Sequence, residues 1–173
     1  GATVSLAQRA DGIYAIFSNV TSPRNLFWRT GVSAGDWSED ASDTPWGIQS
    51  VSGSTASYTN IDVVNFTDNG HAAVAVNVQG TLNPIVMTIN NASTAYTMTP
   101  DNGGGLLRLF SSSFTKMGSG VAQVNVPMLV SNTTLNVVDG TVQLNAGVGA
   151  TAAAPTTMTT PLTIGTNAVL AFG

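Results

Sequence analysis

Residues 76–90 read VNVQGTLNPIVMTIN, a stretch in which apolar and polar side chains alternate on either side of Gly, Asn and Pro residues. Alternation with a period of two is the pattern of a β-strand that buries one face, and Gly, Asn and Pro interrupt strands. The stretch therefore predicts strands of three to six residues separated by tight bends. Similar short runs continue from residue 61 to the end of the chain.

The alternating runs recur along the chain at two spacings. At the first and shorter spacing, Val76, Val78, Met87 and Ile89 map onto Tyr96, Met98, Leu107 and Leu109. At the second and longer spacing, Thr133, Leu135, Val137 and Val142 map onto Thr160, Leu162, Ile164 and Val169. Repeats of this length indicate a solenoid, in which each turn needs stacked neighbours to bury its apolar side.

The composition argues against helices. Among the 173 residues there is one Glu and one Lys, whereas Thr, Ser, Asn, Gly, Ala and Val dominate. Such residues favour strands and turns over helices. We therefore expect an all-β protein, a parallel β-helix (solenoid) with an irregular, Trp-containing N-terminal cap. The alternative is an antiparallel β-sandwich, whose hairpins use the same Asp-Gly and Asn-Gly turns.

The first third of the chain differs from the rest. It contains all three Trp residues and, within residues 36–43, four of the nine acidic residues. We expect residues 1–60 to cap the solenoid and residues 61–173 to form its coils, in one continuous domain. The coil pattern of residues 161–173 is still in register when the sequence stops. It predicts a fragment of a longer protein or, alternatively, a subunit that associates end to end.

Charge and residue usage exclude several classes of function. Five Lys and Arg residues against nine Asp and Glu residues, with no basic run, do not form the positive surface that nucleic acids or anionic membranes require. No apolar stretch approaches the roughly 18 residues that span a bilayer, so this segment is not expected to insert into a membrane. Cysteine is absent, which excludes disulfides and thiolate chemistry.

Two groups of side chains are candidates for binding or catalysis. Asp36, Glu39, Asp40 and Asp43 form an acidic cluster that predicts either a hydrated loop, a calcium site or a glycosidase pair. Trp28, Trp37 and Trp46 lie at equal intervals along the chain. They would form either a stacking platform for sugar rings or the apolar cap of the solenoid.

Catalytic patterns are otherwise lacking in the sequence. The single histidine, His71, follows the turn at residues 68–70 and is expected to be structural, because a general base needs an orienting partner and a nucleophile within reach. No nucleophile elbow, zinc-protease motif or phosphate-binding loop occurs. We therefore expect no enzymatic activity and no cofactor other than the calcium ion that the acidic cluster could hold.

Three stretches carry a resemblance to a known family. They are residues 61–70 (IDVVNFTDNG), residues 76–90 quoted above and residues 134–145 (TLNVVDGTVQLN). They resemble the autotransporter-associated β-strand repeats in the passenger regions of bacterial autotransporters, and residues 27–46 resemble the Trp-rich opening that often precedes these repeats. Two features depart from the family pattern: the Gly-Gly-rich turn of the commonest repeat is not cleanly present, and the membrane-anchoring barrel is missing from the residues given. The resemblance implies a right-handed parallel β-helix displayed at, or released from, a bacterial surface.

The expected function is that of a non-enzymatic secreted or cell-surface solenoid, acting as a stalk, scaffold or adhesin segment. A carbohydrate-binding module that uses Trp28, Trp37 and Trp46 is one alternative, and a self-assembling extracellular fibre subunit is another. The expected location is extracellular or the bacterial cell surface. The expected partners are a host or microbial surface glycan or protein, or further copies of the chain stacked end to end.

Overall fold

The computed structural model describes residues 3–9, 12–18, 22–49, 51–145 and 162–172, which contain strands and no helix. It follows that these residues hold no helix long and apolar enough to cross a bilayer. The strands are β1 (Thr3–Arg9), β2 (Gly12–Ser18), β3 (Asn25–Trp28), β4 (Ala34–Trp37), β5 (Trp46–Ile48), β6 (Val63–Thr67), β7 (Ala73–Leu82), β8 (Val86–Asn90), β9 (Ala95–Phe110), β10 (Ser113–Met117), β11 (Val121–Val124), β12 (Met128–Ser131), β13 (Thr134–Leu144) and β14 (Leu162–Phe172).

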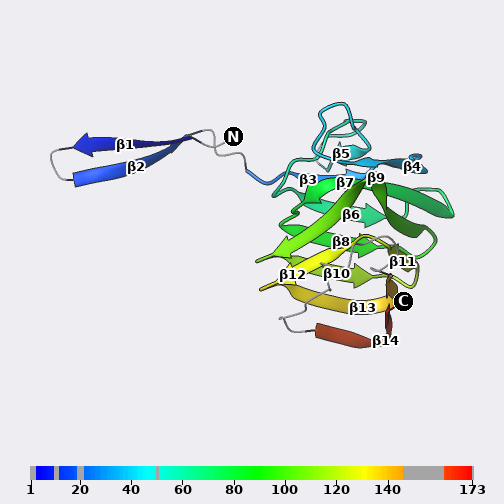
Figure 1. Cartoon of the computed structure of the whole chain (residues 1–173). Helices are drawn as coiled ribbons and strands as arrows, with labels where there is room; N and C mark the ends of the chain where they lie inside the picture. Colours follow the sequence, from blue (N-terminus) through cyan, green and yellow to red (C-terminus); the bar gives the residue numbers. More distant parts are fainter. Residues whose placement is uncertain (1–2, 10–11, 19–21, 50, 146–161, 173) are drawn as a thin grey trace.

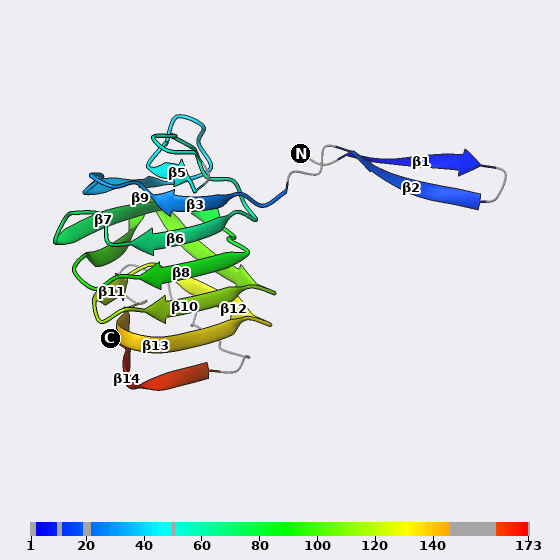
Figure 2. The ribbon, with the colours of Figure 1, turned by 180° about the vertical axis from the view of Figure 1, so that it is seen from behind.

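Successive turns of the chain stack as a parallel β-solenoid of about four turns (Figure 1). One face is formed by β3, β6, β8, β10 and the first parts of β13 and β14, each parallel to the next (Figure 2). A second face is formed by β4, β7, β9, β11 and the second parts of β13 and β14. The predicted all-β solenoid is confirmed, and the antiparallel sandwich is wrong because these faces are built from parallel pairs.

The first of the two predicted repeat spacings is wrong. Val76 pairs with Met98 instead of Tyr96. On the other face Met87 pairs with Phe114, so the chain there runs through more residues before it returns to the same register position. One spacing cannot describe both faces, because the loops between the strands differ in length.

The second predicted spacing is confirmed for part of a rung. It holds for Leu135 and its partner Leu162. Beyond a register shift inside β13 the spacing becomes slightly longer, since Val142 pairs with Leu170. The predicted counterpart of Thr133 lies outside the described residues.

Several strands are longer than the predicted three to six residues because they continue round a corner of the solenoid. Gly80 in β7, Gly104 in β9 and Gly140 in β13 have φ angles of 69°, 89° and 73°. Glycine adopts this left-handed conformation without steric cost, so the backbone can bend while pairing resumes on the next face. A third, shorter face results, made by the ends of β7 and β9 together with β12.

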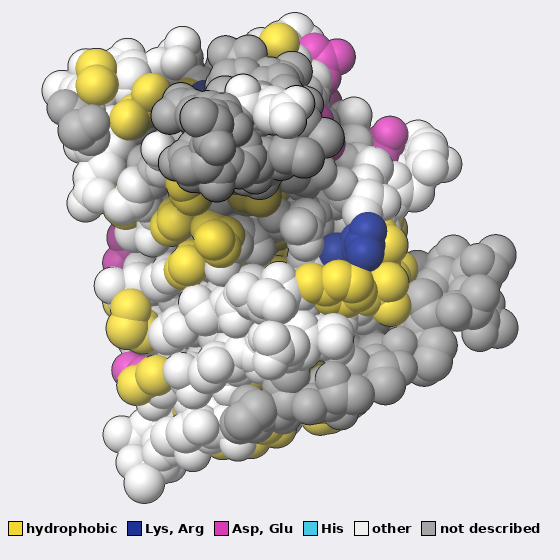
Figure 3. Space-filling model, turned by 90° about the vertical axis from the view of Figure 1, so that its left-hand side faces the viewer, with side chains coloured by type: hydrophobic (Ala, Val, Ile, Leu, Met, Phe, Trp, Pro, Cys, Tyr) yellow, Lys and Arg dark blue, Asp and Glu magenta, His cyan; other side chains and the backbone are white. Residues whose placement is uncertain are grey.

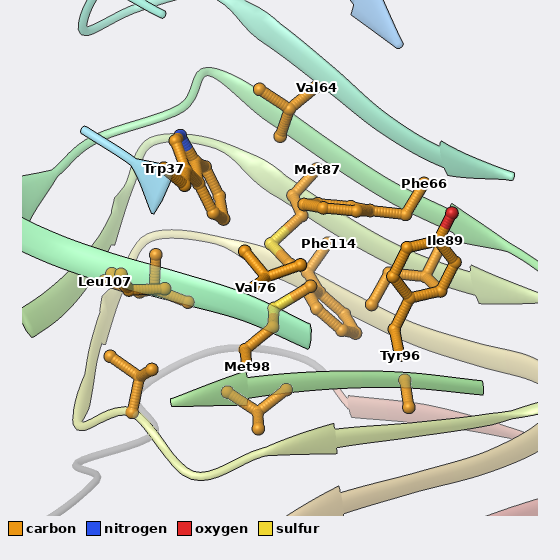
Figure 4. Packing of buried hydrophobic residues seen from close by; sticks show 14 of the residues in the cluster. Trp37, Val64, Phe66, Val76, Met87, Ile89, Tyr96, Met98, Leu107 and Phe114 are labelled. Carbon is orange, nitrogen blue, oxygen red and sulfur yellow. The ribbon is translucent and has the colours of Figure 1, made fainter. Parts of the chain in front are cut away.

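Inward side chains of successive rungs form one apolar core (Figure 4). Alternate residues of each strand are buried, as in β6 and β8, where Val64 and Phe66 lie in register with Met87 and Ile89. Phe114 of β10 continues this column beyond Met87. All five side chains are fully buried. Each rung is therefore covered by its neighbours, as a solenoid requires.

The parallel pairing extends into the segment that the sequence analysis assigns to the cap, since β3 pairs with β6 and β4 pairs with β7. Beyond β3, at the end of the stack, β5 pairs with it in the antiparallel direction. Strands β1 and β2 form a separate antiparallel hairpin, which Figure 1 shows to one side of the stack. The division of the chain at residue 60 stays a prediction.

The close approach of two rungs generates a test at Gly105. A Cβ atom there would lie 2.3 Å from the carbonyl oxygen of Val78, whereas a Cβ atom on Gly103 would meet nothing closer than 3.8 Å. Gly105→Ala is expected to lower the free energy of unfolding by about 1–3 kcal/mol, because the paired backbones must move apart. Gly103→Ala, the matched control, should change it by less than about 0.5 kcal/mol. Urea unfolding followed by circular dichroism measures both, and equal effects would contradict the predicted clash.

Candidate functional site

The three tryptophans lie together inside the solenoid, at the end that β5 covers. Trp28, Trp37 and Trp46 are 2%, 0% and 0% exposed. Trp46 meets Trp28 and Trp37 edge to face, with ring centroids 5.2 and 5.5 Å apart, and all three rings pack on Phe66. Tyr58 extends the cluster beside Trp37, and burial raises the pKa of its hydroxyl above the usual value. These indoles present no face to solvent on which a sugar ring could stack.

The four acidic residues of the predicted calcium site are engaged in separate local contacts. The carboxylate of Asp36 accepts a hydrogen bond from Asn77, and that of Glu39 accepts one from the backbone N–H of Asn60. Ser38 donates to Asp43. No three Asp, Glu or His side chains form a group suited to a metal ion in the part of the chain that the structure describes. The geometry therefore does not assemble Asp36 with the other carboxylates into one coordination sphere.

The remaining acid of that cluster shapes its own loop. The carboxylate of Asp40 accepts hydrogen bonds from the backbone N–H and the hydroxyl of Ser42. These bonds hold the pKa of Asp40 below its ordinary value. An aspartate that bonds to the backbone two residues on forms an Asx turn, which fixes the loop between β4 and β5.

An ion pair that the sequence analysis did not single out joins the first two coils. Arg24 precedes β3 and Asp62 precedes β6, and the guanidinium Nη2 lies 2.6 Å from Oδ2 of the almost fully buried carboxylate. Asp62 also accepts hydrogen bonds from the backbone N–H groups of Arg24 and Thr59. Burial works against ionisation of Asp62, but these donors outweigh it and hold its pKa below the ordinary value.

A second carboxylate links neighbouring coils through backbone amides. Asp68 follows β6, and its Oδ1 accepts hydrogen bonds of 2.9–3.0 Å from the N–H groups of Ala92, Ser93 and Thr94 in the next coil. Although desolvation opposes ionisation, these three donors lower the pKa of Asp68. His71 lies nearby, half-buried, and its backbone N–H donates to the side chain of the preceding turn. This corner uses its polar groups to hold coils together.

A lysine lies inside the apolar column. Lys116 of β10 is fully buried and in register between Ile89 and Val137. Its Nζ donates to the carbonyl oxygens of Met117 and Gly118, at 2.8 Å for Met117. Burial lowers the pKa of this ammonium group. Residues 113–117 alternate between inward and outward positions, and position 116 is inward. The burial of Lys116 could therefore have been predicted from the sequence.

One surface hollow of about 450 Å³ lies beside β3 and β5. Its lining combines the apolar residues Phe27, Ile48 and Val51 with Arg29 and the hydroxyls of nearby Ser and Thr residues. The guanidinium of Arg29 donates a hydrogen bond to the carbonyl oxygen of Thr44, which holds this side chain in place at the edge of the hollow. Carboxylates and histidine are missing from the described lining. The hollow therefore brings together none of the acid and base groups that the sequence analysis considered for catalysis.

Comparison of the chain with protein-family models, with curated proteins and with solved structures finds no match. The carboxylates of Asp40, Asp62 and Asp68 hold a turn or join two coils, and the large aromatic rings close one end of the core.

Buried indoles generate a prediction for fluorescence. The emission of Trp28, Trp37 and Trp46 is expected to be blue-shifted and poorly quenched by iodide in the native protein, since their rings are not in water. Addition of soluble polysaccharides should leave the emission maximum in place. Urea-unfolded protein provides the exposed reference. A polysaccharide-dependent shift would instead support a stacking platform.

The Arg24–Asp62 pair predicts a pH-dependent stability. The pKa of Asp62 is lower in the folded chain, so its contribution is present above the unfolded pKa of about 3.9 and is lost as the pH falls through the folded pKa. Asp62→Asn should therefore cost about 2 kcal/mol of unfolding free energy at pH 7 and progressively less below about pH 4. The control is Asp101→Asn, at a carboxylate outside the salt bridges of the described residues. A pH-independent loss in Asp62→Asn would contradict the ionic origin.

Proposed function

We propose that this chain is a non-catalytic, rigid segment of a secreted or bacterial cell-surface protein, serving as a stalk, scaffold or adhesin segment. The observation that carries the proposal is the unbroken parallel pairing of β3, β6, β8, β10, β13 and β14 along one face, backed by a single core. A stack in which every rung hydrogen-bonds to the next resists bending better than strands joined by flexible loops. Such a segment sets a fixed distance between whatever lies at its two ends.

The outer surface supports an extracellular role. Polar, uncharged side chains succeed one another along the first face, where one register position is occupied by Asn65, Thr88, Thr115, Asn136 and Thr163. On the second face Gln123 donates to Gln143 of the neighbouring rung at 2.9 Å. Figure 3 shows another side of the molecule, on which charged side chains are few. Amides and hydroxyls keep such a surface hydrated without the positive charge that would attract nucleic acid.

The resemblance to autotransporter passenger regions adds to the proposal. A stacked β-solenoid is the architecture that this resemblance implies, and the chain forms one of about four turns. The proposed location is a passenger-like region at the bacterial surface, and the proposed class of partner is a glycan or protein of a host or of another microbe. The polar contacts of Asp62 and Asp68 join neighbouring coils, which supports a rigid segment.

The rigid-stalk proposal predicts a narrow distance between two rungs. The chain has no cysteine, so spin labels can be placed at Asn65→Cys and Thr163→Cys alone. These outward positions are four rungs apart, which corresponds to about 19 Å between backbones at about 4.8 Å per rung. Pulsed electron spin resonance, on labelled protein diluted with unlabelled protein, should give one narrow distribution. The same pair in urea provides the broad reference.

A broad or multiple distribution under native conditions would contradict the role as a rigid spacer. Cleavage of a polysaccharide by the native chain, or saturable binding of a soluble glycan without any surface partner, would replace the proposal with an enzyme or a carbohydrate-binding module.

A further inference from the structure

The hollow beside β3 and β5 lies on the outward side of the first rung, at the end of the stack that β5 covers (Figure 1). Leu26 and Trp28 are the inward residues of β3, and Phe27 and Arg29 alternate with them. Phe27 is in register with Gly47 of β5, which has no side chain to cover it. This pattern leaves an aromatic ring and a guanidinium in the wall of an open volume of about 450 Å³.

Arg29 supplies the charge of this hollow. Its Nη1 lies 3.2 Å from the carbonyl oxygen of Thr44, to which it donates. The salt bridge of the described residues joins Arg24 to Asp62, so no described carboxylate lies within ion-pair distance of Arg29. A guanidinium has five N–H donors in a planar fork that fits a carboxylate, and Thr44 takes only part of this capacity. Arg29 is therefore held in place with donors left for an anion.

A turn in the wall of the same hollow adds backbone donors. The N–H of Val51 donates to the carbonyl oxygen of Ile48, and the N–H of Ser54 donates to that of Val51. Between them Gly53 has a φ angle of 72°, and it lines the hollow together with Ser52. Turns of this kind direct successive N–H groups toward one side and form concave sites for anions.

The rest of the lining selects the kind of anion. Phe27, Ile48 and Val51 form apolar wall, and Arg29 is the single charged side chain among the described lining residues. A phosphate group carries nearly two charges and is matched by several donors and cations. One guanidinium beside apolar side chains instead matches a monocarboxylate that carries an apolar group.

A second hollow, of about 330 Å³, adjoins the first. It is lined by Arg24, Asn25, Ile48 and Gln49, of which the last two also line the first hollow. The side chains of Asn25 and Gln49 are joined by one hydrogen bond of 2.5 Å. Each amide has further donor and acceptor capacity, which suits the N–H and C=O groups of a peptide backbone. The site is therefore longer than a small carboxylic acid needs.

We propose that these two hollows bind the C-terminus of a partner protein, with its terminal carboxylate on Arg29 and an apolar last residue against Phe27, Ile48 and Val51. Capture of a terminal carboxylate by a guanidinium and backbone amides is a recurring mode of peptide recognition. The inference rests on the proposed adhesin role, because it names the class of partner and the surface that meets it.

The test is an array of short peptides with free C-termini that covers every combination of the last two residues. The full chain, fluorescently labelled, should bind peptides whose last residue is apolar. It should not bind the same peptides with amidated C-termini, because the amide removes the charge that Arg29 recognises. Added NaCl should weaken binding, since this contact lies at the surface.

Two pairs of variants locate the site. Arg29→Gln should weaken peptide binding about tenfold or more, the loss expected for a hydrogen bond to a charged group. Its control is Arg108→Gln, at a guanidinium that lies over the ring of Phe110. Val51→Asp should also abolish binding, because it places a negative charge beside the carboxylate. Val138→Asp is the control for that change, since the two valines are 52% and 53% exposed. Both controls should bind as the native chain does.

Circular dichroism checks the fold of each variant, and Val51→Asp serves alone if Arg29→Gln does not fold. Absence of binding to every peptide up to about 1 mM, the weak end of specific affinity, would overturn the proposal. Equal binding of amidated peptides, equal losses in the control variants, or binding of a uronic-acid oligosaccharide but of no peptide would also overturn it. A narrow distance between the rung labels at residues 65 and 163, found together with absent peptide binding, rejects this site and leaves the rigid stalk.

Discussion

The whole structure depends on the vertical spacing of about 4.8 Å that parallel hydrogen bonding imposes between rungs. At that spacing an inward side chain touches the equivalent side chains of the rungs on both sides. Met87 is buried because Val64 lies in register with it on one side and Phe114 on the other. The same spacing brings backbones together at the corners, where Gly105 faces the carbonyl oxygen of Val78. Burial and backbone geometry are thus set by one distance.

At the corners of the stack the strands end, so backbone groups there lack the partners that a neighbouring strand would supply. Polar side chains of this protein bond to those backbone groups. The side chain of Asn91 donates to the carbonyl oxygens of Thr94 and Val121, and Asp68 accepts from three amides of the next coil. The buried ammonium of Lys116 bonds to carbonyl groups at the end of β10. An unpaired buried backbone group costs about as much as a lost hydrogen bond. These side chains therefore act as parts of the scaffold at the corners of the stack.

The fold class could be predicted from the sequence because period-two alternation and repetition are properties of the chain itself. Rung lengths could not, because the loops between strands differ in length, so Val76 and Met87 recur at different offsets. The tryptophan cluster shows the same limit. An equal spacing of the three residues suits either a cap or a platform, and only the fold shows Trp46 turned inward.

The polar contacts were harder still to predict. Asp62 and Arg24 lie far apart in the sequence, and an isolated acid gives no sign of its partner. Lys116 could be predicted in principle, because it occupies the same alternation as Phe114. A charged residue at an inward position is normally taken as evidence against a strand. Here the carbonyl groups of the adjacent turn accept its hydrogen bonds, which is visible only once the turn is in place.

A solenoid is stabilised mainly by contacts between neighbouring rungs, so its end rungs have half the support of the middle ones. In the first rung, the contacts that a preceding rung would make are supplied by β5, which pairs with β3, and by the tryptophans. A few of these large rings are enough to cover the core. Nothing comparable covers β14 among the described residues. Local stability should therefore decline from the aromatic end toward β14. Whatever covers the β14 rung must supply apolar surface and backbone partners together, because either one alone would leave the other unsatisfied.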